Sequence, residues 1–129
     1  MRELPQTRLE KISRLYTTAP QYVEDQPRFI NAAVRIATTL PPRALLAALK
    51  HIEYTMGRIP CRRFGPRLID MDILLYGGKI VRSARLRIPH PRMHERMFVL
   101  KPLAEIAPNA VHPVLRKRTK ALLEHLMQH

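Results

Sequence analysis

Twelve prolines divide this chain of 129 residues into short segments, and they limit what it can fold into. Proline has no backbone N–H to donate, and its ring clashes with the preceding turn of a helix. The prolines therefore punctuate the chain and mark its loops. The sequence predicts one compact domain of short elements over residues 1–129, a normal length for a single domain.

Between the prolines, hydrophobic periodicity predicts both helices and strands. Residues 29–39 alternate with a period of two, which predicts a strand whose core face carries Ile30, Ala32, Val34 and Ile36. Apolar residues at helical spacing predict a helix over 42–56 that ends at Gly57. Other segments are predicted as a short helix (3–11), strands (11–18 and 68–78), a loop (58–67), a hairpin (79–91), two short helices (91–97 and 99–108) and a last helix (119–127). This order favours an α+β fold: a ferredoxin-like α/β sandwich with a mainly antiparallel sheet.

The charge balance points to an anionic partner. Twenty-three Lys and Arg face ten Asp and Glu, which gives a net charge of +13. That excess favours a nucleic acid, an acidic surface or a polyphosphate as partner. The single cysteine, Cys61, excludes an internal disulfide and a zinc site of several thiolates. No membrane span and no signal peptide are recognisable, so a cytoplasmic location is expected.

Two of the three aspartates lie two residues apart in one apolar run. In a strand, Asp70 and Asp72 would point to the same face, about 7 Å apart. Such oxygen ligands suit Mg²⁺ that also binds water and substrate phosphates. Gly-Pro-Arg just before them makes a rigid turn that brings Arg67 near the same place. The pattern therefore suggests phosphoryl transfer, although a solvated strand face with Asp paired to Arg would produce the same spacing.

A second constellation is the basic segment 85–98. His90 and His94 have the i, i+4 spacing of a helical metal site, but the prolines on either side of His90 argue against a helix. Phosphate recognition is the better interpretation, and a solvated basic loop remains possible. Three phenylalanines lie outside the apolar pattern, and an aromatic next to an amide, Phe29 beside Asn31, is equipped to bind a flat heterocycle or simply to cover a sheet surface. The other two are Phe64 and Phe98.

Taken together, these motifs resemble 6-hydroxymethyl-7,8-dihydropterin pyrophosphokinases. The run FGPRLIDMDILLYG is similar to the signature of that family. The segments YTTAPQYVEDQPRFINAAV and RLRIPHPRMHERMFVLKPLAEIAP resemble two further conserved blocks, so the resemblance covers about residues 12–110 in consistent order. It implies a folate-pathway transferase that moves a diphosphate from ATP to the pterin hydroxymethyl group and releases AMP.

The resemblance also implies roles for individual residues. Asp70 and Asp72 match carboxylates that bind two Mg²⁺ ions between ATP and pterin. Catalytic roles are implied for these two and for Arg62, Arg63 and Arg67; ATP binding for Glu53, Arg67, Ile73, Arg85, His90 and Arg96; and pterin binding for Thr18, Phe29, Asn31, Phe64 and Phe98.

One departure concerns the start of the chain. The family begins with a strand and a Gly-Ser-Asn loop that lead into its first helix, whereas this chain is expected to begin inside that helix. Losing that strand would expose sheet edges, so self-association that completes the sheet is a further expectation.

Two other functions remain open at this point. A catalytically inactive remnant or subunit would bind Mg-ATP without turnover. A basic nucleic-acid-binding module would explain the net charge but not the two aspartates, which would repel a phosphate backbone.

Overall fold

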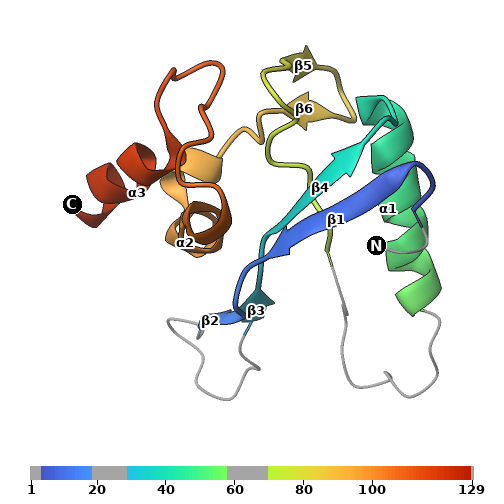
Figure 1. The fold of residues 1–129 in the computed structure, drawn as a ribbon, viewed down its shortest axis with the longest axis horizontal. Helices are drawn as coiled ribbons and strands as arrows, with labels where there is room; N and C mark the ends of the chain where they lie inside the picture. Colours follow the sequence, from blue (N-terminus) through green and yellow to red (C-terminus); the bar gives the residue numbers. More distant parts are fainter. Residues whose placement is uncertain (1–3, 19–28, 58–69, 129) are drawn as a thin grey trace.

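The computed structural model describes residues 4–18, 29–57 and 70–128. Its elements are β1 (Thr7–Ile12), β2 (Tyr16–Thr18), β3 (Phe29–Asn31), β4 (Val34–Thr38), α1 (Pro42–Gly57), β5 (Val81–Arg82), β6 (Arg87–Ile88), the 3₁₀ turn η2 (Met93–Glu95), α2 (Met97–Ile106) and α3 (Thr119–Met127). Figure 1 shows β1 and β4 as a central ribbon, with α1 along one side and α2 and α3 packed together on the other. The small α+β fold with antiparallel strands is confirmed.

The strands pair as three antiparallel two-stranded sheets in the described residues: β1 with β4, β2 with β3, and β5 with β6. In the first sheet Thr7 pairs with Thr38 and Ile12 with Val34, with an irregularity between Leu9 and Lys11. The predicted helix over 3–11 is therefore wrong. Leu9 and Ile12 have helical spacing, but the bulge lets both lie on one face of a strand.

The predicted single strand over 29–39 is also interrupted. The Ser13 N–H donates to the Ala33 carbonyl and the Ala33 N–H donates to Ser13 Oγ, both at 2.9 Å, and the strand is interrupted here, between β3 and β4. Ala33 is buried at this interruption, whereas Ile30 and Val34 are 63% and 44% exposed. Ala32 is exposed too. Of the four residues predicted to face the core, only Ile36 packs against it.

The helices follow the prediction closely. Helix α1 begins at Pro42, where the missing N–H has no cost, and ends at Gly57. Helix α3 has the predicted bounds, and the two short helices predicted over 91–108 are η2 and α2. The small hairpin is present as β5 and β6. No helix in the described part of the chain is long and apolar enough to cross a membrane.

Residues 70–76 do not form a strand in the structure, contrary to the prediction. Within the described residues this segment has no sheet partner and ends in a turn where Lys79 N donates to the Tyr76 carbonyl. Gly77 takes a positive φ of 53° in that turn, as glycine does readily.

The segment joins two hydrophobic clusters. Ile73 belongs to the cluster beneath α1, and Leu74 and Leu75 pack against the cluster formed with α2 and α3. The burial expected from the sequence is thus kept without a ladder: Ile73 is buried while Asp70 and Asp72 are exposed.

Candidate functional site

Helix α1 holds the peptide that lies between the two aspartates. The Met71 N–H donates to a carboxylate oxygen of Glu53, and Lys50 Nζ donates to the Met71 carbonyl at 3.4 Å. Lys50 and Glu53 also pair with each other at 3.2 Å, one turn apart on the helix. Both backbone groups of Met71 therefore have side-chain partners, which fixes the orientation of the Asp70–Asp72 segment.

A pocket of about 260 Å³ opens beside this segment. It lies between α1, the extended segment, the β5–β6 hairpin and the turn that follows the hairpin. Its lining residues are Leu46, Lys50, Asp72, Ile73, Ala84, Arg85, Leu86, Arg87, His90 and Pro91. We call it the α1 pocket.

The α1 pocket brings together four residues singled out from the sequence: Asp72, Ile73, Arg85 and His90. They are separated by up to 18 positions along the chain, so the fold and not the local sequence makes them neighbours. His90 is attached to the extended segment by its own N–H, which donates to the Leu74 carbonyl at 2.9 Å. The lining suits a ligand with an apolar part and several negative charges, because it has three cationic side chains, Lys50, Arg85 and Arg87, and one carboxylate, that of Asp72.

The sequence analysis assigned no individual role to two charged residues of the α1 pocket, Lys50 and Arg87. The available signals were weak: Lys50 precedes Glu53 by three residues on the same helix, and Arg87 alternates with Arg85. Neither lies in the Asp-containing run that directed attention to the site.

Glu53 is placed differently from the other candidates. It does not line the pocket, and its largely buried carboxylate is engaged by Met71 and Lys50. The structure thus shows Glu53 as a residue that positions the aspartate segment.

The candidate pterin residues lie on elements that contact each other. Thr18 pairs with Phe29 and Tyr16 with Asn31 across β2 and β3, and both strands contact α2. Phe98, on α2, is 38% exposed, and the Arg96 guanidinium lies 5.8 Å from its ring centroid. Arg96 does not line the α1 pocket.

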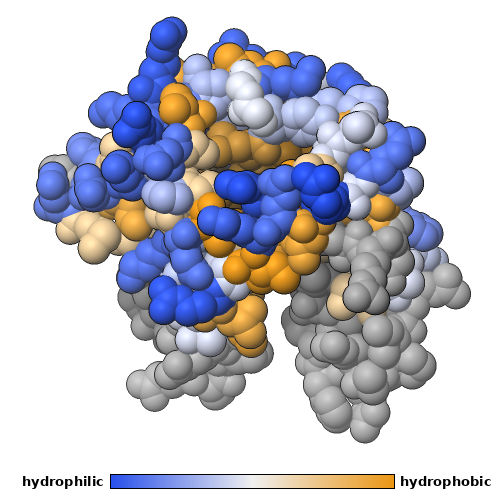
Figure 2. Space-filling view, viewed as in Figure 1, coloured by the Kyte–Doolittle hydropathy of each residue, from blue (hydrophilic) through white to orange (hydrophobic). Residues whose placement is uncertain are grey.

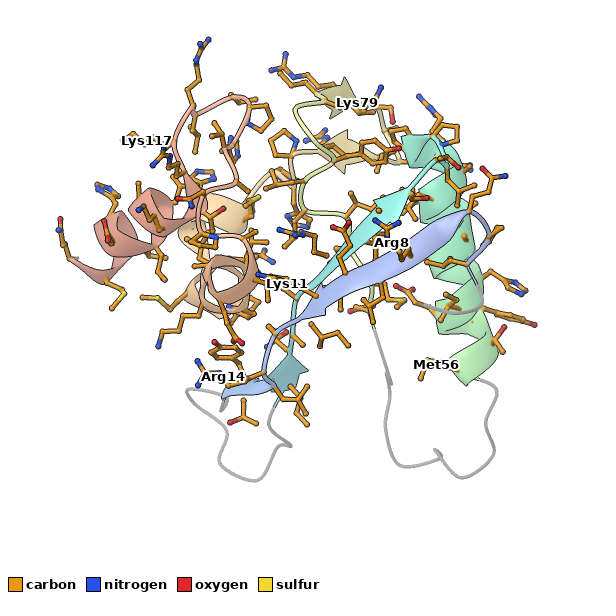
Figure 3. All side chains as sticks on the ribbon, in the orientation of Figure 1. Arg8, Lys11, Arg14, Met56, Lys79 and Lys117 are labelled. Carbon is orange, nitrogen blue, oxygen red and sulfur yellow. The ribbon has the colours of Figure 1, made fainter. Side chains whose placement is uncertain are left out.

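Glu105 fastens β2 to α2. It accepts hydrogen bonds from the Tyr16 hydroxyl at 2.7 Å and from the Arg14 backbone N–H at 3.2 Å. The hydroxyl and the Arg14 groups hold the pKa of Glu105 below its usual value. Figure 3 labels Arg14 at the end of the β1–β4 ribbon, where its backbone N–H contacts Glu105 of α2.

Four candidates, Arg62, Arg63, Phe64 and Arg67, lie outside the described residues. In the described ranges no group of three or more His, Cys, Asp or Glu forms a metal site. Asp70 and Asp72 alone fit a different kind of site, in which Mg²⁺ has one or two carboxylates and takes its remaining ligands from water and phosphates.

Comparison with known proteins gives a consistent result. The family model for 7,8-dihydro-6-hydroxymethylpterin-pyrophosphokinase matches residues 1–108. A 2-amino-4-hydroxy-6-hydroxymethyldihydropteridine pyrophosphokinase from Haemophilus influenzae is 42% identical over 128 residues, which cover 97% of this chain and 80% of the relative. The protein of the same name from Pseudomonas aeruginosa is 47% identical over 106 residues, 82% of this chain and 65% of the relative.

Some relatives are much longer. A mitochondrial folate synthesis bifunctional protein from Pisum sativum is 57% identical over 97 residues, which cover 75% of this chain and 19% of the relative. The chain thus spans about a fifth of the length of such relatives. These comparisons favour neither an inactive remnant nor a nucleic-acid-binding module.

Proposed function

Because the chain belongs to the 7,8-dihydro-6-hydroxymethylpterin-pyrophosphokinase family, we propose that it transfers a diphosphate from ATP to the hydroxymethyl group of 6-hydroxymethyl-7,8-dihydropterin and releases AMP. The activity makes it a transferase of folate biosynthesis. The observation that carries the proposal is the α1 pocket, which gathers Asp72, Ile73, Arg85 and His90 from separate segments.

In this proposal ATP binds in the α1 pocket. Leu46 and Ile73 supply apolar surface for a base, while Arg85 and Lys50 offer positive charge to phosphates. Arg67 and Arg96 are proposed as further nucleotide contacts, Arg67 from outside the described residues. Glu53 contributes by holding the Met71 N–H, so that Asp72 is presented to the same pocket.

Asp70 and Asp72 are proposed to hold two Mg²⁺ ions. Both side chains are exposed, and the Met71 backbone between them is held by Glu53 and Lys50 of α1, which suits a carboxylate pair for hydrated cations. When bound, Mg²⁺ neutralises phosphate charge and orients the reacting groups. The chain's own contribution is to place the carboxylates and arginines before the substrates arrive, so that little reorganisation is needed during reaction.

The pterin is proposed to bind beside β2, β3 and α2. Asn31 has amide groups for hydrogen bonding to the heterocycle and Phe98 an exposed ring for stacking. Thr18 contributes through its backbone and Phe29 through its position opposite Thr18 in the ladder. Arg62, Arg63 and Phe64 are proposed to act from the segment before Asp70. The pterin hydroxyl oxygen would attack the β-phosphorus of ATP in line with the departing AMP.

Assembly is a further part of the proposal. The face of the β1–β4 ribbon that carries Leu9, Ile12 and Val34 is 41–59% exposed at these side chains, and within the described residues β4 pairs on one edge only. Figure 2 shows apolar surface along the lower side of this ribbon. We propose that a second copy covers this face and supplies a strand, so that the sheet becomes a ferredoxin-like one.

A cytoplasmic location is also proposed. The pea relative is named mitochondrial, so fractionation of cells that express the tagged protein would check the location.

The direct test is AMP release from ATP and 6-hydroxymethyl-7,8-dihydropterin with Mg²⁺. We expect Asp72→Asn to lower the rate by about 10²–10³-fold, the usual effect of removing one group that stabilises transition-state charge. The matched control is Glu124→Gln, which removes the same charge from an exposed position on α3 and should leave the rate unchanged. A folded wild-type chain that releases no AMP would refute the proposed activity.

A further inference from the structure

A second recess lies next to the α1 pocket, on the other side of His90. Its volume is about 540 Å³, within the range of small-molecule sites. The β5–β6 hairpin forms one wall and the loop between α2 and α3 the other, and Figure 2 shows this face hollowed between them. Its lining residues are Ile80, Val81, Arg82, Ser83, Ala84, Arg87, Ile88, Pro89, His90, Pro91, His94, His112, Val114 and Leu115. We call it the hairpin recess.

Two arginines face each other across the hairpin. Arg82 on β5 pairs directly with Arg87 on β6, and both line the recess. Like charges at directly opposite positions of a two-stranded sheet destabilise it. Neither guanidinium pairs with a carboxylate of the described residues, and none of the recess residues is Asp or Glu. This repulsion is relieved when an anion binds between the two groups.

Three imidazoles add polar groups to the same recess. The Nδ1 atoms of His90 and His94 are buried and have no hydrogen-bond partner in the part of the chain that the structure describes. His112 is 5% exposed, and its Nδ1 accepts the N–H groups of Val114 and Leu115 at 3.3 and 3.0 Å. That acceptor role leaves the ring proton of neutral His112 on Nε2, where it is a donor.

The rest of the wall is apolar and exposed. Ile80, Val114 and Leu115 are 49%, 46% and 38% exposed, so each has surface to bury against a ligand. Figure 3 labels Lys79 beside the hairpin and Lys117 on the opposite loop, and neither lysine lines the recess itself. The combination suits a ligand with both an anionic group and an apolar body, and the excess of cations disfavours a metal ion.

We propose that the hairpin recess binds a small phosphate-bearing molecule with an apolar moiety. The phosphate lies between Arg82 and Arg87, and the apolar part covers Val114 and Leu115. Because Arg87 and His90 line both cavities, a ligand here changes the affinity of the α1 pocket for its own ligand, and the reverse holds equally. The proposal concerns a separate site and does not depend on AMP release.

The test measures the binding of 1-naphthyl phosphate, the probe, by calorimetric titration. Inorganic phosphate and 1-naphthol, the two halves of the probe, are titrated separately for comparison. The wild-type chain should bind the ester more tightly than either half. Arg82→Gln should bind it about tenfold more weakly, the effect of losing one charge-assisted hydrogen bond. The same variant should melt at a higher temperature without ligand, because it removes the cross-strand repulsion.

Three control variants and one further test variant, Val114→Asp, complete the design. Arg43→Gln removes the same charge from an exposed position on α1 outside both cavities and should change neither binding nor melting. Val114→Asp should abolish binding, whereas Val111→Asp, at a 50% exposed valine of the same loop, should not. Lys50→Gln alters only the α1 pocket and should leave probe affinity within about twofold, well under the tenfold that one lost charge-assisted contact gives.

Several results would overturn the proposal. One is that Arg82→Gln binds the probe as tightly as wild type, and another is that Arg43→Gln weakens probe binding as much as Arg82→Gln does. A third is that Lys50→Gln loses probe binding, which would place the probe in the α1 pocket. A chain that binds the probe but releases no AMP would refute the proposed enzyme and leave this site standing.

Discussion

At the residue scale, Glu53 decides how the aspartate segment is presented. Its carboxylate accepts the Met71 N–H and pairs with Lys50, whereas the resemblance implied a direct nucleotide contact. The two roles predict different kinetics. A contact residue raises the KM for ATP when it is lost, whereas a residue that positions the carboxylates lowers kcat.

We predict that Glu53→Ala lowers kcat for AMP release by about 10²-fold, the effect of misplacing reacting groups by about 1 Å, with little change in the KM for ATP. Glu53→Gln should keep most of the activity, because its amide oxygen still accepts the Met71 N–H. Steady-state kinetics of both variants, with Glu124→Ala as the control, check this. Equal losses in the two variants, or a rise in KM alone, would exclude the positioning role.

At the element scale, the loop between α2 and α3 depends on His112. Its Nδ1 accepts two N–H groups, its own N–H donates to the Lys117 carbonyl at 2.9 Å, and its carbonyl accepts the Arg116 N–H at 2.7 Å. Burial, and secondarily the positive charge of nearby His94, lower the pKa of His112 below 6.5. The neutral ring is therefore the form that the folded loop stabilises.

Because the pKa of His112 is lowered in the folded chain, the sign of the pH dependence of stability is fixed. Below about pH 6.5 the unfolded chain takes up a proton that folded His112 resists, so the free energy of unfolding falls as the pH is lowered. We predict that His112→Asn, whose amide oxygen can accept the same N–H groups, flattens this dependence. His112→Ala should cost about 1–3 kcal/mol at pH 7.5, because two N–H groups lose their acceptor. Urea unfolding between pH 7.5 and 5.5 measures both; an unchanged slope in His112→Asn would contradict the assignment.

The helices and the strands differed in how well the sequence predicted them. Helix α3 matched its predicted bounds because the hydrogen bonds within a helix join residues four positions apart. The strand predictions failed where the chain contacts a distant partner: Ser13 bonds to Ala33 where the strand is interrupted, and the pairing of β1 with β4 has an irregularity between Leu9 and Lys11. Periodicity in one segment contains no information about either contact.

The candidate site divides along the same lines. Asp72, Arg85 and His90 were found because they lie in contiguous motifs that suggest chemistry. Lys50 was missed because only the folded chain brings it to the pocket, whereas Arg87 lay in the basic segment 85–98 but was given no role of its own.

At the scale of the whole molecule, the exposed face of the β1–β4 ribbon is the surface through which we propose that two copies associate. Ile12 is 59% exposed and lies opposite Val34 in the sheet. Exposed apolar patches of this kind mark surfaces that associate. If a second copy covers the ribbon, charge on this face opposes association.

We predict that Ile12→Asp shifts the protein from dimer to monomer and weakens association at least tenfold, because a carboxylate would be buried without a partner. Val111→Asp, at a 50% exposed position far along the chain, should leave the dimer intact. Light scattering behind size exclusion over a range of concentrations measures the equilibrium. A wild-type chain that is monomeric at every concentration would refute the self-association proposal.

The extended segment 70–76 has one more consequence. It is packed into both hydrophobic clusters, through Ile73 on one side and through Leu74 and Leu75 on the other. We therefore expect that a displacement of either cluster also displaces the aspartates. Substitutions in the core of α2 and α3 that leave the pocket lining untouched are then expected to lower the rate of AMP release, so the tolerance of that distant core to mutation would be set by chemistry as well as by stability.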